Sequence, residues 1–308
     1  MRRSVSAIAA LLALAALAAF PAHAAEDTVR FDEVVARMRD TIDRTDHAAW
    51  RPAFEAMCQR HGLDPNSAEL FRDFVRLQSV FEATRDGGMW RVRWAVTNRE
   101  PTSKAIWQSW QKETPPLQGA PSVTAECDEI SALTAFLATK LEVRGVGLFW
   151  PTWNHTIAAW EPRPLLASAK DPARRKKPRI LLPTTQVFQG CDDALDHTTF
   201  DPSHQGAVFE YTLLDVRPGT RMASSLATFL VEQLEAYNGA SLDLLALLRL
   251  HRGKLLRSSV GDCADQRSRL AASISITAAN ERALTRYFAM ELARSAGNAR
   301  EMLAELAR

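Results

Sequence analysis

The sequence predicts an α+β fold in which one helix and a small antiparallel sheet are flanked by helical segments on both sides. Three observations support this prediction. Apolar residues recur at helical spacing in the first third of the chain and again from Arg221 to the end. Between these segments, one helical pattern precedes several short strand-like runs. A helix followed by successive strands is typical of an α+β domain whose sheet is antiparallel.

The first 24 residues have the three parts of a secretory signal. Two arginines follow Met1, an alanine- and leucine-rich run covers residues 7–20, and Pro-Ala-His-Ala ends at Ala24. We expect cleavage after Ala24 and a mature protein that is periplasmic or secreted. The alternative, a transmembrane anchor, needs a longer apolar run to cross about 30 Å of hydrocarbon. No later segment is long and apolar enough to form a membrane span.

The N-terminal helical segment is predicted over residues 25–114. Its first helical pattern runs from Phe31 to Cys58 with a break near His47, and a second runs from Ser67 to Thr84. Asp-Gly-Gly at 86–88 is a strong helix stop. A strand-like stretch and a further helical pattern follow at residues 89–97 and 103–111.

The predicted α+β core covers residues 122–218, after a Pro- and Gly-rich linker at 115–121. Its helix is expected at about 125–141, and its strands at 145–150, 156–160, 179–188 and 207–216. The C-terminal helical segment follows over 219–308. Within the core, the basic run at 170–179 is typical of a solvated loop between strands, although a docking patch for an anionic surface is the alternative.

Charge and cysteine content limit the partners and cofactors. The chain has 38 basic and 36 acidic residues, and removal of the signal with its two arginines leaves the mature chain formally neutral. We therefore expect no nucleic acid partner.

The four cysteines are Cys58, Cys127, Cys191 and Cys263. In an oxidising compartment an even number of cysteines predicts two disulfides. If Cys127 is a free thiol instead, one bridge and one further free thiol are expected. Since no CxxC pair or metal-ligand spacing is present, we expect no structural zinc and no other cofactor.

The most informative segment for chemistry lies between Thr124 and Trp160. With Thr124 as the N-cap, Cys127 falls in the first turn of the core helix, where free N–H groups and the helix dipole favour a thiolate. Those N–H groups also suit the oxyanion of an attacked carbonyl. His155 begins a predicted strand that can pack against this helix. A cysteine activated by a neighbouring histidine is a common arrangement for acyl transfer.

Three features of this segment resemble the transglutaminase-like superfamily, which shares its Cys-His arrangement with papain-like cysteine proteases. They are a Cys at the start of an amphipathic helix, the exit sequence Leu-Glu-Val-Arg-Gly-Val-Gly and a Trp-Asn-His strand, within about residues 124–188. The resemblance implies that Cys127 is the nucleophile and His155 the base. The third family residue, usually Asp, would fall near 181–186, where no acid occurs. Gln186 is the preferred substitute, and Thr184 and Asp201 are the alternatives.

These observations lead to one main functional hypothesis and two others. The first is an exported transglutaminase-like cysteine hydrolase, with a peptide or protein substrate, in which Cys127, His155 and Gln186 form the catalytic group. The second is a non-catalytic exported scaffold or binding protein that retains the fold and bridges its cysteines. The third is a glycosidase with Glu82 as general acid, although no paired carboxylate is evident and an exposed Glu at a helix end is the simpler interpretation.

Overall fold

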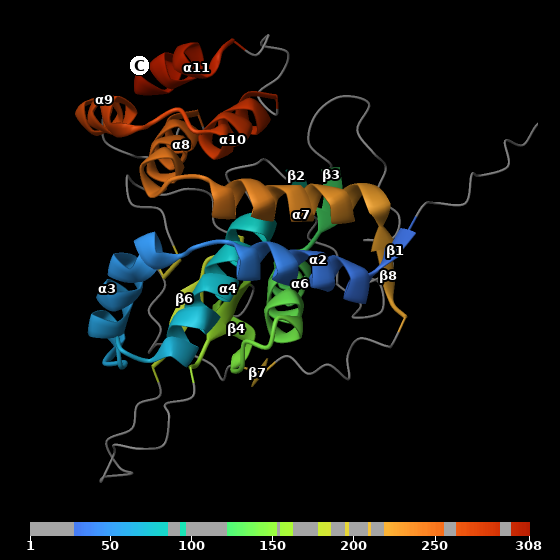
Figure 1. Ribbon diagram of the computed structural model, residues 1–308. Helices are drawn as coiled ribbons and strands as arrows, with labels where there is room; N and C mark the ends of the chain where they lie inside the picture. The colour runs from blue at the N-terminus through green and yellow to red at the C-terminus, as the bar shows by residue number, and fades with distance from the viewer. Residues whose placement is uncertain are drawn as a thin grey trace, which may run out of the picture.

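The computed structural model describes residues 28–85, 93–96, 122–152, 155–162, 178–185, 195–196, 209–210, 219–255, 263–289 and 297–308 (Figure 1). The predicted signal, the helical pattern at 103–111 and the linker at 115–121 lie outside these residues. The described helices are α2 (Phe31–Arg44), a 3-10 turn (Ala48–Trp50), α3 (Arg51–His61), α4 (Ala68–Thr84), α6 (Cys127–Lys140), α7 (Ser224–Gly239), α8 (Leu242–Leu255), α9 (Ala264–Ser273), α10 (Ala278–Ala289) and α11 (Ala299–Ala307).

The principal sheet confirms the predicted α+β class with antiparallel strands. It has the order β6 (Ile180–Leu182), β5 (His155–Trp160), β4 (Val146–Thr152) and β7 (Phe209–Glu210), and its neighbours are all antiparallel. Helix α6 packs against β4 and β5, and α4 packs on α6. Helices α2 and α7 lie side by side over α4 and α6 (Figure 1). The helix that carries Cys127 is therefore enclosed between the sheet and a helical layer.

Two additional strand pairs lie outside this sheet. β1 (Thr28–Arg30) pairs antiparallel with β8 (Arg221–Ala223), which joins the N-terminal end of the described chain to the strand that precedes α7. β2 (Arg93–Val96), within the strand-like stretch expected at 89–97, pairs parallel with β3 (Ser122–Ala125). The sequence pattern does not predict this parallel pair, because its two strands are far apart in the chain. β3 leads directly to the residue before α6, so the pair positions the start of that helix.

One hydrophobic cluster connects the three predicted segments. It includes the fully buried Met38 of α2, Leu77 of α4, Leu133 of α6 and Leu230 of α7. A second, smaller cluster of Phe149, Ile157, Ala159 and Leu181 comes from β4, β5 and β6. Side chains alternate along a strand, so the sheet is buried on both faces. The N- and C-terminal helices therefore share one core with α6.

The C-terminal end of α6 is held by two arginines from the helical layer. Arg39 Nη2 donates to the carbonyl of Lys140 at 2.9 Å, and Arg76 Nη1 donates to the carbonyl of Leu141 at 2.6 Å. The last carbonyls of a helix have no intrahelical donor, and cations near them interact favourably with the helix dipole. These contacts fix α6 at the end opposite Cys127.

One detail differs from the sequence predictions. Arg179, the last residue of the basic run predicted as a solvated loop, is largely buried, lies over the Phe149 ring and forms an ion pair with Glu161 at 2.9 Å. The other residues of that run lie outside the described part, except Pro178.

In the described residues, no helix has both the length and the apolar character needed to cross a membrane.

The turn before β4 requires a glycine, and its substitution provides the first prediction. Gly145 has φ +80°, and a Cβ there would lie 2.2 Å from the carbonyl oxygen of Glu161, whose N–H donates to the Gly145 carbonyl. We expect Gly145→Ala to lower the free energy of unfolding by about 2–5 kcal/mol through backbone strain and overlap. Urea unfolding followed by circular dichroism measures this change.

Gly219 is the matched control for this substitution. It has φ +83°, but among the described residues, its chain neighbours aside, no atom lies within 4 Å of an added Cβ. We expect Gly219→Ala to lower the free energy of unfolding by only about 1–2 kcal/mol, which is the cost of a left-handed backbone conformation at an alanine. Equal losses of stability in the two variants would contradict the proposed overlap with Glu161.

Candidate functional site

The start of α6 differs from the prediction by two residues. Thr124 belongs to β3 and pairs with Ala95, so its extended backbone continues the strand and the helix begins after it. Glu126 is the N-cap and forms a capping box with Glu129, whose carboxylate accepts the Glu126 N–H at 2.8 Å. Cys127 is thus the first residue of the helix. Its N–H is not used by the capping box.

Cys127 is a free thiol and is partly exposed. Cys58 is also free, but it is buried, and burial raises the pKa of its thiol to about 11. The predicted pair of disulfides is therefore wrong, because two of the four cysteines are not bridged. Cys191 lies outside the described residues, so a bridge between the other two cysteines stays a prediction. Of the two free thiols, only Cys127 is accessible enough to react with a substrate.

Two carboxyl groups lie in the first turn beside Cys127. Burial raises the pKa of both Asp128 and Glu129. Ionised carboxylates next to the sulfur oppose thiolate formation, which the helix dipole favours. The raised pKa values mean that these carboxyls become neutral at a higher pH than usual, so this opposition weakens as the pH falls.

His155 is the first residue of β5, as expected, and pairs with Thr152 across the β4–β5 turn. Its Nε2 atom lies 3.2 Å from the hydroxyl of Thr185. The ring is half-buried, and burial lowers the pKa of His155 below its ordinary value of 6.5. The neutral imidazole, which is the form that accepts a proton, therefore predominates at neutral pH.

Ser131 connects the start of α6 to the His155 end of β5. It lies one turn after Cys127, and its hydroxyl is 2.6 Å from the Cys127 carbonyl and 3.2 Å from the carbonyl of Thr156. One hydroxyl therefore contacts the carbonyl of Cys127 and the carbonyl of Thr156, the residue that follows His155. The Cys127 thiol and the His155 ring form no hydrogen bond to each other. In enzymes without substrate, catalytic hydrogen bonds are often long and shorten only in the substrate complex.

The predicted third residue, Gln186, lies outside the described residues, as does Asp201. Thr184 is fully buried, and its hydroxyl is 2.7 Å from Ser131 Oγ and 3.4 Å from the N–H of Ala158. It therefore supports α6. Thr185, which the sequence analysis did not select, contacts the ring. Both threonines lie in the turn that follows β6, and the sequence alone does not show which of them faces His155.

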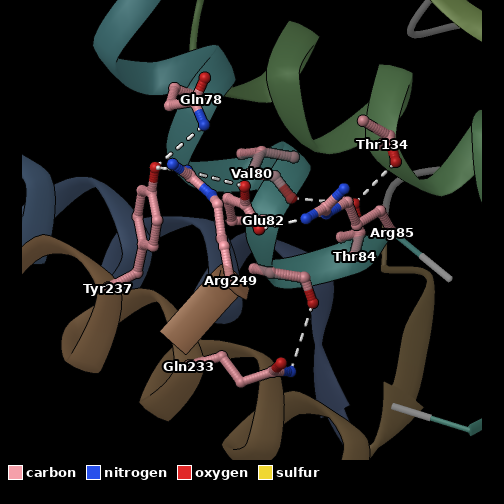
Figure 2. A network of polar contacts seen from close by, with 10 residues as sticks. Gln78, Val80, Glu82, Thr84, Arg85, Thr134, Gln233, Tyr237 and Arg249 are labelled. Atoms are coloured by element: carbon pink, nitrogen blue, oxygen red, sulfur yellow. Dashed lines mark hydrogen bonds and ion pairs between the residues drawn. The ribbon is translucent and has the colours of Figure 1, made fainter. Parts of the chain in front are cut away.

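Glu82 occupies a buried polar network, in contrast to the predicted exposed helix end (Figure 2). Its carboxylate forms ion pairs with Arg85 Nε at 3.1 Å and with Arg249 Nη2 at 3.0 Å. Tyr237 receives hydrogen bonds from Gln78 and Arg249, and burial raises the pKa of its phenol to about 12. A glycosidase acid must reach a polymer and carry a proton. A fully buried carboxylate enclosed by two guanidinium groups cannot reach a polymer.

Within the described part of the chain, no group of three or more His, Cys, Asp or Glu residues is arranged to hold a metal ion. No protein-family model matches the chain, and no curated protein or solved structure matches it either.

Proposed function

We propose that this protein is an exported transglutaminase-like cysteine hydrolase that acts on peptide or amide bonds through Cys127 and His155. The observation that supports this most directly is the contact of Ser131 with the carbonyls of Cys127 and Thr156. This contact lies one turn after Cys127, a free and partly exposed thiol at the helix N-terminus, and one residue after His155 in β5. The order of elements, with the helix before the strands, is the order of the family that the sequence resembles.

The proposed reaction begins with transfer of the Cys127 thiol proton to His155. Because Thr185 contacts Nε2, Nδ1 is the nitrogen that takes this proton. The sulfur then attacks the carbonyl carbon of the substrate, and the oxyanion is stabilised by the Cys127 N–H at the positive end of the helix dipole. When the tetrahedral intermediate breaks down, the C–N bond breaks and His155 gives its proton to the leaving amine. Water, deprotonated by His155, hydrolyses the thioester and regenerates the thiol.

The lowered pKa of His155 predicts the pH dependence of this reaction. The base must be unprotonated, and burial shifts its protonation to a pH below the ordinary 6.5. We therefore expect the acidic limb of kcat/KM to have its midpoint below 6.5, so that activity persists in mildly acidic buffer. A pH series of initial rates measures this midpoint. A midpoint above 6.5 would contradict a base whose charged form is disfavoured by burial.

The proposal is tested with the purified mature protein, residues 25–308. We expect turnover of at least one member of a panel of peptides and peptide amides, and rapid alkylation of Cys127 by iodoacetamide, located by mass spectrometry. Substrate should slow this alkylation. If no peptide or amide is cleaved and Cys127 reacts no faster than an ordinary exposed thiol, the hydrolase assignment fails. The non-catalytic scaffold from the sequence analysis then remains.

A further inference from the structure

Two neighbouring threonines follow β6 and contact opposite parts of the site. Thr184 contacts Ser131 of α6 at 2.7 Å, as described above. Thr185 Oγ1 lies 3.2 Å from His155 Nε2 and 3.5 Å from the carbonyl oxygen of Thr156. This short segment therefore supports both the helix that carries the nucleophile and the ring of the base.

The direction of the hydrogen bond at Thr185 follows from its second contact. A threonine hydroxyl has one proton to donate and lone pairs that can accept. The Thr156 carbonyl can only accept, so the Thr185 proton belongs to that contact. The hydroxyl then accepts from the ring, and the proton of the neutral imidazole lies on Nε2. In this tautomer Nδ1 carries no proton and can act as a base.

We propose that Thr185 is the positioning residue of His155 and acts in place of the carboxylate that the third position usually provides. This inference rests on the proposed function, which requires a base with an unprotonated Nδ1. A hydroxyl orients the ring and selects its tautomer. Unlike a carboxylate, it carries no charge that would stabilise an imidazolium.

The test uses three variants of the mature protein labelled with ¹⁵N-histidine. Thr185→Val removes the hydroxyl at nearly constant volume, and Thr185→Ser restores it. Thr184→Val is the matched control, because it removes a neighbouring hydroxyl that contacts Ser131 instead of the ring. Ring ¹⁵N shifts report the tautomer, and the His155 signals are identified by their absence in His155→Gln. Circular dichroism establishes that each variant is folded.

We expect the wild type, Thr185→Ser and Thr184→Val to show the tautomer with the proton on Nε2, and Thr185→Val to show a mixture of both. For hydrolysis, we expect Thr185→Val to lose about tenfold of kcat, because the ring loses its fixed orientation as well as its single tautomer, while Thr185→Ser stays near the wild-type value. If the tautomer in folded Thr185→Val equals that of the wild type, the positioning role is overturned.

The nuclear magnetic resonance measurement separates this inference from the proposed function. If the ring responds to Thr185→Val while even the wild type cleaves no substrate, Thr185 still positions His155 and the hydrolase assignment alone fails. If the wild type is active and neither tautomer nor kcat changes in Thr185→Val, the hydrolase assignment stands and the role of Thr185 fails.

Discussion

Replacement of Cys127 by Ala is expected to abolish peptide or amide hydrolysis and to leave the protein folded. The substitution removes the sulfur that forms the covalent intermediate, and no other described free thiol lies at the start of α6. We expect kcat/KM to fall by at least about a thousandfold. The fold should persist, because the residue is partly exposed and Ala is a good helix former. Initial rates and thermal unfolding of the same preparations measure both effects.

Cys58→Ala is the matched control for this variant. The Cys58 thiol is buried in the core, and burial raises its pKa to about 11, so it is a poor nucleophile at neutral pH. We expect full activity from Cys58→Ala and a loss of about 1 kcal/mol in unfolding free energy from the small cavity. Retained hydrolysis in Cys127→Ala would exclude Cys127 as the nucleophile. Loss of hydrolysis in folded Cys58→Ala would show that the wrong thiol had been assigned.

Replacement of Glu82 by Ala is expected to destabilise the protein more than any other single change considered for the helical layer. Glu82 and Arg85 are fully buried, and Arg249 completes the ion-paired group. A buried ion pair need not stabilise a fold relative to apolar residues. Removal of the Glu82 carboxylate nevertheless takes the nearest opposite charge away from a buried guanidinium group, at a cost of about 3–5 kcal/mol. Urea unfolding of Glu82→Ala and Glu82→Gln should show a large decrease in the transition midpoint.

An exposed ion pair with the same sequence spacing provides the control. Arg30 and Glu33 are three residues apart, as are Glu82 and Arg85, but both side chains are more than half exposed, at 56% and 52%. We expect Glu33→Ala to leave the unfolding midpoint almost unchanged, because exposed pairs are screened by water and salt. Similar effects of Glu33→Ala and Glu82→Ala would contradict the argument that burial determines the cost.

Measurements on Glu82→Gln also distinguish a role of Glu82 in stability from a role in catalysis. If Glu82 served as a general acid, Glu82→Gln would lose activity at temperatures where it remains folded. We expect instead that folded Glu82→Gln retains hydrolysis, since Glu82 contacts arginines of the helical network and has no exposed surface. Activity and circular dichroism, measured at the same temperature, distinguish the two outcomes.

The elements with strong local signals could be predicted from the sequence. The helix from Ala68 to Thr84 has an apolar stripe and begins after Ser67, whose hydroxyl accepts the Leu70 N–H as an N-cap. The break between α2 and α3 and the order of one helix followed by strands were also predictable. The same local patterns placed Cys127 at the start of a helix and His155 at the start of a strand.

The start of α6 and the burial of Glu82 could not be predicted, because both depend on contacts between segments that are distant in the sequence. Thr124 has the chemistry of an N-cap, but pairing of β3 with β2 holds it in a strand, and the helix starts two residues later than expected. Glu82 has the sequence setting of an exposed residue, but α7 and α8 bring Tyr237 and Arg249 against its helix. The sequence around Thr124 does not indicate that β2 is its partner strand, and the sequence around Glu82 does not indicate that α7 and α8 pack against its helix.

The α+β class could thus be predicted from local sequence patterns. The same patterns predicted the residue types of the candidate site, which are a thiol at a helix N-terminus and an imidazole at a strand end. Periodicity and capping are properties of neighbouring residues, so they can be read from a single segment. The contact of Thr185 with the His155 ring, and the contact of Ser131 that joins α6 to β5, could be found only in the tertiary structure. Those contacts depend on strand register and on how the chain packs, which are set by interactions between residues remote in sequence.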